Sequence, residues 1–360
     1  MAQLGLTTYR LNNNIKSTAL LIAFPFLLLT LLGASVFFFA LFVGPQEQFA
    51  AIDAQSVLGT GSPLDVALSA VYAWWPLVFG VAAIWLLIGY FFNDVIIHRA
   101  TGATPVTREQ QPKLYNLVEN LCISRGMAVP KLYIVDTDAM NAYASGIDDR
   151  SYAITVTSGL LDRLNGDELE AVLAHELTHI INRDCRLLIV TIVFVGMISF
   201  LTQLLWRSLR LVAFTRVRSK GGAPVLVFVI IAAVAFAIGY VLALVLRFAI
   251  SRRREYQADA GSVDLTKNPD ALISALLKIA QNPDVPHVPS EVRQMFIEDP
   301  PSGLDLGGLF ATHPPIAKRI QVLEELGGHV PQIGSESSSP PNTGAPSSPA
   351  PSGFKSPWQP

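Results

Sequence analysis

The chain has 360 residues, of which 51% are hydrophobic and only 15% are charged, and its mean hydropathy is +0.42. Soluble domains average about 25% charged residues, so this composition excludes an ordinary soluble globular protein and indicates a membrane protein with a soluble part. The net charge of -2 provides no basic field for nucleic acid, and we expect no such partner. Two cysteines, Cys122 and Cys185, are too few for a disulfide framework, so we expect ordinary buried thiols in a reducing compartment.

Four apolar stretches are long enough to cross a bilayer, which takes about 20 helical residues. None of them contains Asp, Glu, Lys or Arg, the side chains that hydrocarbon penalises most. The first stretch is too long for the apolar part of a signal peptide and no clear cleavage site follows it, so we expect a retained anchor. The predicted spans are residues 18–43, 67–92, 187–206 and 224–246.

Basic residues are distributed unevenly around these spans. Lys and Arg occur in residues 1–17 and after the second span, whereas the loop 44–68 contains neither. Because cytoplasmic flanks are enriched in Lys and Arg, we expect a multi-pass protein of the inner (plasma) membrane whose N-terminal segment is cytoplasmic and whose loop 44–68 is extracytoplasmic. The loop between spans three and four is also basic. Either the rule fails there, or these two spans form a hairpin that does not fully cross.

Helical and strand-like patterns predict the organisation of the two soluble segments, 93–186 and 247–332, which flank the membrane hairpin 187–246. Asn165 with Glu168 three residues later is typical of a capping box at a helix start. The segment 333–360 is rich in Ser, Pro and Gly and is predicted to be a disordered tail. The expected helices are 107–125, 165–183, 251–260, 269–281 and 314–326, the expected strands are 131–135, 141–145 and 152–157, and a loop is expected at 283–309.

The sequence HELTH at residues 175–179 is an H-E-x-x-H motif. His175 and His179 are about one helical turn apart, so both imidazoles can point at one metal ion. Zinc accepts histidine nitrogen, and a catalytic zinc site has three protein ligands and a water. Glu176 stands beside the first ligand, where it can take a proton from that water. We therefore predict one Zn²⁺ per chain; the alternative is a solvated helix face that carries two histidines by chance.

The third ligand is predicted to be Glu255, on the helical segment 251–260. Asp259 lies one turn later on the same face, where its carboxylate can accept the second N–H of a metal-bound histidine. Taken alone, Glu255 would read as part of the charged flank of a membrane span. If His179 and Glu255 hold one ion, spans three and four must cross the membrane together or not at all.

Four motifs occur in a fixed order, with two apolar spans between the second and the third. They are NAYASG at 141–146, HELTH at 175–179, Glu255 with Asp259, and THPP at 312–315 followed by Arg319. In this combination the sequence resembles the HtpX-like membrane zinc endopeptidases, relatives of the CAAX prenyl proteases. The resemblance extends over residues 10–328 and leaves out the C-terminal tail.

The resemblance implies an α-helical membrane protein with an α+β zincin-like (gluzincin) catalytic domain. It implies that Asn141, Ala142 and Tyr143 belong to an edge strand that pairs with the substrate backbone, as exposed strand edges can. It also implies that His313 donates a hydrogen bond to the developing oxyanion and that Arg319 orients the site or pairs with a carboxylate. The alternative readings are an ordinary hairpin strand, a loop histidine and a solvated helix position.

The implied activity is zinc-dependent hydrolysis of peptide bonds in membrane or misfolded proteins, as in membrane protein quality control and the stress response. The expected partners are therefore protein substrates and the lipid bilayer, with the catalytic domain on the cytoplasmic side. One alternative is a CAAX-type prenyl-protein protease, which four spans favour less because more are expected there. Another is a catalytically silent membrane scaffold that keeps zinc for folding.

Overall fold

The computed structural model describes residues 2–43, 62–215, 222–286, 288–293, 295–298 and 313–330. Residues up to Val330 form one compact unit, and the predicted tail lies outside the described residues. The helices are α1 (Ala2–Val43), α3 (Pro63–Thr101), α4 (Pro112–Arg125), α5 (Ser158–Arg163), α6 (Gly166–Ile181), α7 (Asp184–Thr215), α8 (Gly222–Thr266), α9 (Pro269–Ile279), α10 (Ser290–Arg293) and α11 (Ile316–Glu325). The strands are β1 (Thr104–Pro105), β2 (Lys131–Val135), β3 (Ala142–Ser145) and β4 (Ala153–Thr157).

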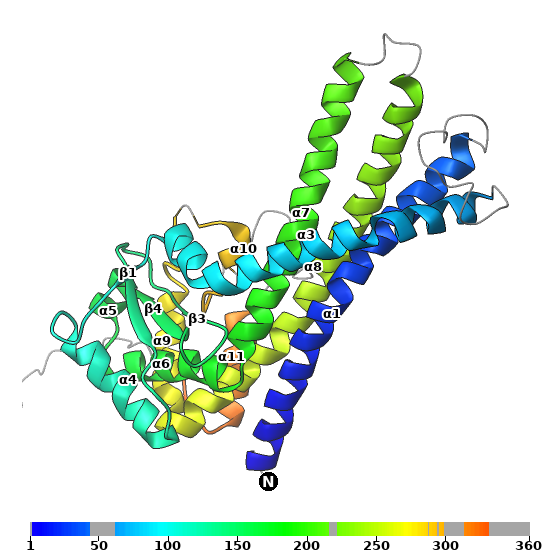
Figure 1. Ribbon diagram of the computed structural model, residues 1–360. Coiled ribbons are helices and arrows are strands. Elements are labelled where there is room, and N and C mark those ends of the chain that lie inside the picture. Colours follow the sequence, from blue (N-terminus) through cyan, green and yellow to red (C-terminus); the bar gives the residue numbers. More distant parts are fainter. Residues whose placement is uncertain are drawn as a thin grey trace, which may run out of the picture. The chain divides into compact units, whose positions relative to one another are not determined.

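Four of these helices, α1, α3, α7 and α8, are long and apolar enough to cross a membrane, which confirms the predicted spans. In α3 only 11% of the apolar window is buried within the protein. Its outer surface carries exposed aromatic side chains such as Trp74 and Trp75, which suit a lipid environment. Helices α7 and α8 run side by side as a hairpin, and α1 packs against α3, α7 and α8 (Figure 1).

Several element boundaries differ from the sequence-based expectation. Helix α8 is continuous through the fourth span and the segment 251–260, which were expected as separate helices. No Gly or Pro interrupts 247–260, so nothing there stops the helix at the membrane surface. Helix α4 begins at Pro112 rather than at 107, with proline in the first turn, where its missing N–H has no cost. The short elements β1, α5 and α10 were not predicted.

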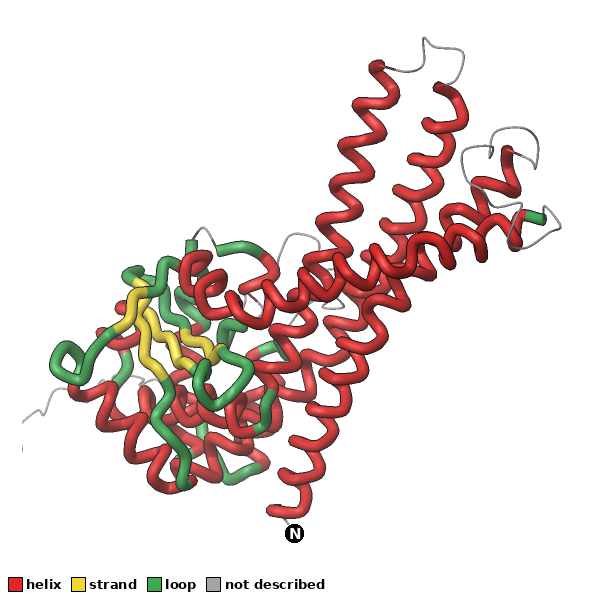
Figure 2. The backbone as a smooth tube through the Cα atoms, viewed as in Figure 1, coloured by secondary structure: helices red, strands yellow, loops and turns green. Residues whose placement is uncertain are grey.

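The four strands form one mixed sheet in the order β1-β2-β4-β3. Strands β2 and β4 are parallel, whereas β3 pairs antiparallel with β4, with Ala142 opposite Val156 and Ser145 opposite Ala153. The three predicted strands are therefore confirmed, and β3 is at the edge of the sheet. Helices pack on one face of the sheet, as Figure 2 shows. The main hydrophobic core lies between β2–β4, α4, α6 and α9.

Helix α6 carries the HELTH sequence and is held at several points. The predicted capping box is present: the Asn165 side chain accepts from the Glu168 N–H at 2.9 Å, and the Glu168 carboxylate accepts from the Asn165 N–H at 2.8 Å. Helix α8 approaches α6 closely at Gly261, where a Cβ atom would lie 2.3 Å from Cγ2 of Thr178. The Ser262 hydroxyl also donates to the Ala171 carbonyl at 2.7 Å. These contacts fix α8 beside the helix with the two histidines.

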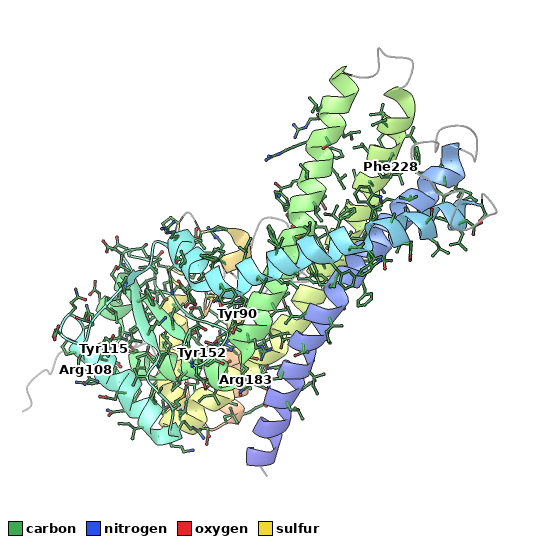
Figure 3. All side chains as sticks on the ribbon, viewed as in Figure 1. Tyr90, Arg108, Tyr115, Tyr152, Arg183 and Phe228 are labelled. Atoms are coloured by element: carbon green, nitrogen blue, oxygen red, sulfur yellow. The ribbon has the colours of Figure 1, made fainter. Side chains whose placement is uncertain are left out.

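A tight turn joins α6 to the membrane helix α7. Arg183 in this turn has φ 59°, a left-handed conformation that is uncommon outside glycine. The turn lies beside α1, to which it is hydrogen-bonded, and Arg183 is labelled there in Figure 3. The soluble part and the membrane helices are therefore joined directly at the end of α6.

Candidate metal centre

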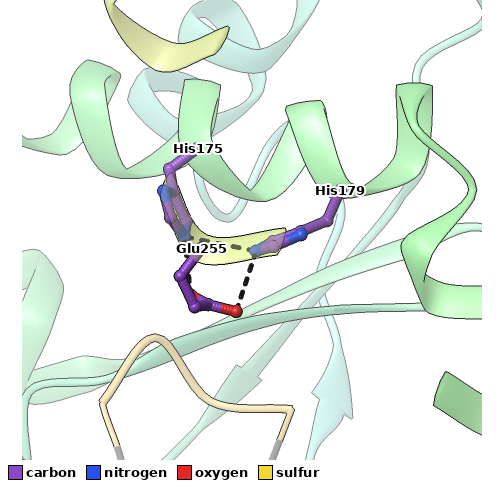
Figure 4. Close-up of side chains that lie close together, drawn as sticks. All are labelled: His175, His179 and Glu255. Carbon is purple, nitrogen blue, oxygen red and sulfur yellow. Dashed lines mark hydrogen bonds and ion pairs between the residues drawn. The ribbon is translucent and has the colours of Figure 1, made fainter. Parts of the chain in front are cut away.

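Three predicted ligands converge from two helices, as Figure 4 shows. The Nε2 atoms of His175 and His179 on α6 are 3.2 Å apart. Glu255 on α8 places Oε2 at 3.6 Å from Nε2 of His175 and Oε1 at 3.8 Å from Nε2 of His179. One ligand atom from each residue lies within 4.8 Å of the others. Glu255 follows His179 by 76 positions and His175 by 80, and the three residues meet because α8 lies along α6.

The donor set fits a single zinc ion. Tetrahedral zinc with bonds of about 2.0–2.2 Å keeps its ligand atoms roughly 3.3–3.6 Å from each other. The histidine Nε2 atoms are 3.2 Å apart, close to that spacing, and the two oxygens of Glu255 lie 3.6 Å from one of them and 3.8 Å from the other. Two imidazoles and one carboxylate are also a ligand combination found in catalytic zinc sites. The residues present are therefore suited to hold the metal.

The far nitrogen of His175 is held by a buried ion pair. Its Nδ1 lies 3.0 Å from Oδ1 of Asp259. Arg319 binds the same carboxylate with two groups, Nε to Oδ2 at 2.9 Å and Nη2 to Oδ1 at 2.6 Å. Both side chains are fully buried, and such a two-point contact fixes the carboxylate in position. Asp259 and Arg319 thus lie next to the predicted ligand His175.

The far nitrogen of His179 is held by a residue that was not predicted from the sequence. Nδ1 of His179 lies 3.0 Å from Oδ2 of Asp184, the first residue of α7. The other oxygen of Asp184 accepts a hydrogen bond from Asn13 of α1 at 2.7 Å. The available sequence signals were an acidic residue five positions after His179 and an asparagine at the start of an apolar helix. Neither signal reveals that the two residues meet.

Glu176 is buried beside the ligand cluster. Its side chain lines a small cavity of about 20 Å³ together with His179, Glu255 and Ala144. Both carboxylate oxygens are buried without a hydrogen-bond partner in the described part of the chain. Burial raises the pKa of Glu176, although the nearby histidines act in the opposite direction. A cavity of this size holds about one water molecule, which is what a general base needs beside it.

His313 approaches the cluster from the segment before α11. Its Nδ1 lies 3.2 Å from Oε2 of Glu255, and the side chain is buried. Burial by itself would raise the pKa of Glu255. The effect of His313 and His175 is opposite and larger, so the pKa of Glu255 falls well below its usual range. Burial lowers the pKa of His175, yet hydrogen bonds to Asp259 and Glu255 raise it to about 9. The Glu255 carboxylate is therefore ionised, as a metal ligand must be.

The edge strand β3 is covered by the chain itself at one end. Asn141 and Ala142 are each 1% exposed. The Asn141 amide donates to the carbonyls of Pro283 and Glu298, both at 2.8 Å, and the Ile297 N–H donates to the Ala142 carbonyl at 2.9 Å. The sequence reading expected an exposed edge at Asn141–Tyr143. It could not foresee that residues 295–298 pair with this end.

Tyr143 points into the protein rather than toward the cavity. Its side chain is 0% exposed, packs edge-on against Phe296 and lies 2.8 Å from the Thr101 hydroxyl. Ala144, by contrast, lines the cavity beside Glu176. The Asn141 carbonyl accepts a hydrogen bond from Thr157 of β4. Because alternate residues of an antiparallel strand bond to its neighbour, the backbone N–H and C=O groups of Ala142 and Ala144 point away from β4. Of these two residues, Ala144 is the one beside the cavity.

Comparison with known proteins places this site in a family. Residues 108–327 match Peptidase family M48, a range that contains all three ligand residues and His313. The chain belongs to peptidase family M48. As a member of this metallopeptidase family with four helices long and apolar enough to span a membrane, it is a membrane metalloprotease, and its family implies a bound metal.

Proteins named as HtpX homologues align over most of the chain. "Protease HtpX homolog" of Bacteroides fragilis strain YCH46 is 44% identical over 332 residues, 91% of this chain and 100% of that protein. "Protease HtpX homolog" of Dictyoglomus turgidum is 40% identical over 236 residues, 65% of this chain and 76% of that protein. The crystal structure of S. mikatae Ste24p matches with a TM-score of 0.44 and 20% identity over 70% of this chain and 58% of that chain. The family match and the HtpX homologues confirm the predicted resemblance at the level of the family.

Proposed function

We propose that this M48 protein is a zinc-dependent endopeptidase whose metal is held by His175, His179 and Glu255. The observation that carries the proposal is the convergence of three ligand atoms within 4.8 Å, beside the carboxylate of Glu176, which is not one of the ligands. Bound zinc would polarise the scissile carbonyl and lower the pKa of its water toward ~7. The other steps fall to side chains of this chain.

Glu176 is the proposed general base. In its ionised form it accepts a proton as water attacks the carbonyl carbon, and it passes this proton to the amine nitrogen when the C–N bond breaks. His313 is proposed to donate a hydrogen bond to the oxyanion, for which its place beside Glu255 gives support. Asp259 and Arg319 keep the His175 ring oriented. The proposed reaction is thus peptide-bond hydrolysis.

The substrate backbone is proposed to pair with the outer edge of β3. The predicted residues Asn141 and Ala142 lie at the end that residues 295–298 cover, whereas Ala144 lies beside the cavity. The cavity of about 20 Å³ accommodates a water molecule but no peptide. Entry of a polypeptide therefore requires residues 295–298 to move from the edge. Because Phe296 pairs antiparallel with Tyr143, substrate would take the place of this segment along Ala142–Ala144.

The catalytic site is proposed to face the cytoplasm. The N-terminal segment carries Arg10 and Lys16, the sign of a cytoplasmic flank. Because Asn13 of α1 contacts Asp184 at 2.7 Å, the basic end of α1 lies at the level of the metal centre. Proteins of the membrane and misfolded chains that reach this surface are the proposed substrates, in keeping with membrane protein quality control. The proposed membrane is the inner (plasma) membrane.

The test uses the full chain purified in detergent. Removal of metal with a chelator is expected to abolish cleavage of an unfolded model protein, and one equivalent of Zn²⁺ is expected to restore it. Glu176→Gln is expected to bind zinc normally and to lose at least about 100-fold in rate, the low end of a general-base effect. Glu170→Gln, on the same helix and partly exposed, is the matched control and should keep full activity.

Two results would refute the proposal. Full hydrolysis by Glu176→Gln with zinc bound would remove the mechanism. Zinc binding by the wild-type chain without turnover of any unfolded protein would favour the silent scaffold. Turnover confined to a prenylated C-terminal peptide would instead favour the CAAX-type protease.

A further inference from the structure

A buried amide in the first membrane helix makes an unusual pair of contacts. Asn13 is only 2% exposed and lies at the start of the apolar stretch Leu11–Phe42 of α1. Its side-chain NH₂ donates to the Asn182 carbonyl at 3.1 Å and to Oδ1 of Asp184 at 2.7 Å. A buried amide in an apolar helix is costly unless it is hydrogen-bonded, so these contacts fix where α1 lies.

Both acceptors belong to the turn that ends the HELTH helix. Asn182 follows α6, Arg183 has a left-handed backbone, and Asp184 begins α7. Oδ2 of Asp184 lies 3.0 Å from Nδ1 of His179. Asp184 therefore stands between Asn13 and His179, with one oxygen toward each.

The two histidines of the metal centre thus have the same kind of support. For His175 the carboxylate is Asp259, which is held by Arg319 of α11. For His179 the carboxylate is Asp184, which is held by Asn13 of α1. A carboxylate that accepts from Nδ1 leaves Nε2 free for the metal and sets the plane of the ring. The orientation of that carboxylate depends in turn on the side chain that donates a hydrogen bond to it.

We propose that Asn13 is a positioning residue for the metal centre: it orients Asp184, which holds His179 in its ligand conformation. This inference rests on the proposed zinc site. It assigns to the first membrane helix a part in metal binding, in addition to anchoring the chain. The amide acts as a hydrogen-bond donor, so the shape of the side chain alone does not replace it.

The experiment measures zinc affinity in detergent by competition with a chelator, in a Glu176→Gln background that prevents autocleavage. Asn13→Asp keeps the size of the side chain but turns an acceptor toward Asp184, and a loss of at least about tenfold in affinity is expected. Asn12→Asp, which adds the same charge at an exposed neighbouring position, is the matched control and should bind zinc like the parent. The d–d spectrum of bound Co²⁺ should change only in the Asn13 variant.

A reversed pair separates positioning from folding. In the Asn13→Asp/Asp184→Asn double variant, the new amide can donate to the new carboxylate while its oxygen still accepts from His179. We expect this double variant to bind zinc several-fold more tightly than Asn13→Asp alone. If Asn13→Asp binds zinc as tightly as the parent, or the reversed pair gives no recovery, the positioning role is wrong. If the Glu176→Gln parent itself binds no zinc, the proposed function fails instead.

Discussion

The main-chain N–H of Ile297 donates to the main-chain carbonyl of Ala142 at 2.9 Å, so a segment of the chain lies on the strand edge that the sequence assigns to substrate. Asn141 reinforces this contact through its bonds to the Pro283 and Glu298 carbonyls. Asn141→Ala removes both bonds, each worth about 0.5–1.5 kcal/mol, and leaves two acceptors without their donor. We expect a loss of roughly 2–3 kcal/mol in stability and new proteolytic cleavage sites within residues 283–298.

Thermal unfolding in detergent and limited proteolysis measure these effects. Asn116→Ala, an exposed asparagine on α4, is the control and should change neither. Unaltered protease resistance of residues 283–298 in Asn141→Ala would show that this amide does not hold the segment on β3.

Arg319 is the fully buried cation that neutralises Asp259. Arg319→Gln leaves the Asp259 charge buried without its partner, a change that costs about 3–5 kcal/mol. We expect a large fall in the midpoint of thermal unfolding and weaker zinc binding, because Asp259 no longer fixes His175. Lys318→Gln, at the exposed adjacent position, should have little effect. Equal stability of the two variants would contradict the structural role of the Arg319–Asp259 pair.

Local signals in the sequence predicted much of the fold. The capping box from Asn165 to Glu168 spans four residues, and the ligand pair in HELTH spans about one helical turn, so each pattern is complete within a short window. The four spans follow from hydropathy alone. The need for a third ligand beside HELTH, with Asp259 one turn after Glu255, also led to Glu255, which the structure brings to the two histidines although it lies beyond two apolar helices.

The missed features depend on contacts between distant residues. Asn13 and Asp184 are 171 positions apart, and nothing in the apolar pattern of α1 identifies its partner. The pairing of Ile297 with Ala142 depends on where the loop after α9 returns to the sheet. The fourth span and the segment 251–260 were predicted as separate helices, whereas α8 is continuous because its backbone hydrogen bonds are made within the helix and nothing there interrupts them.

Glu168 makes stability depend on pH in a defined direction. Its carboxylate accepts from Lys278 at 2.7 Å and from Ser274 at 2.6 Å. Burial by itself would raise the pKa of Glu168. These hydrogen bonds have the opposite and larger effect, so the folded-state pKa is below the ordinary value of about 4.3. Ionised Glu168 therefore stabilises the folded state fully when the pH is above that ordinary value. This stabilisation is lost as the pH falls through the lower folded-state pKa.

We expect Glu168→Gln to unfold at a lower temperature than the wild-type chain at pH 7, with a difference that narrows as the pH falls below about 4. Groups that titrate equally in both proteins cancel in this difference. Unfolding midpoints in detergent at several pH values from 7 to 3 give the measurement. A difference that stays constant over this range would mean that the Glu168 charge does not contribute.

Gly261 sets the distance between the two helices that carry the predicted ligands. A Cβ atom there would lie 2.3 Å from Cγ2 and 2.7 Å from Oγ1 of Thr178, which is itself buried and bonded to the Ala174 carbonyl. Gly261→Ala must therefore push α8 away from α6, an overpacking that costs about 1–3 kcal/mol. Glu255 lies on the same helix, so its carboxylate is expected to move from the histidines and zinc affinity to fall.

Gly196→Ala provides the matched comparison, because a Cβ at this helical glycine of α7 meets nothing within 4 Å. That variant should be neutral or more stable by up to about 1 kcal/mol, the difference between Ala and Gly in a helix. Zinc affinity and thermal midpoint are measured for both variants. If Gly261→Ala retained the zinc affinity of the wild type, the ligand geometry would not depend on the close packing of α6 and α8, since the added methyl group has no other place to go.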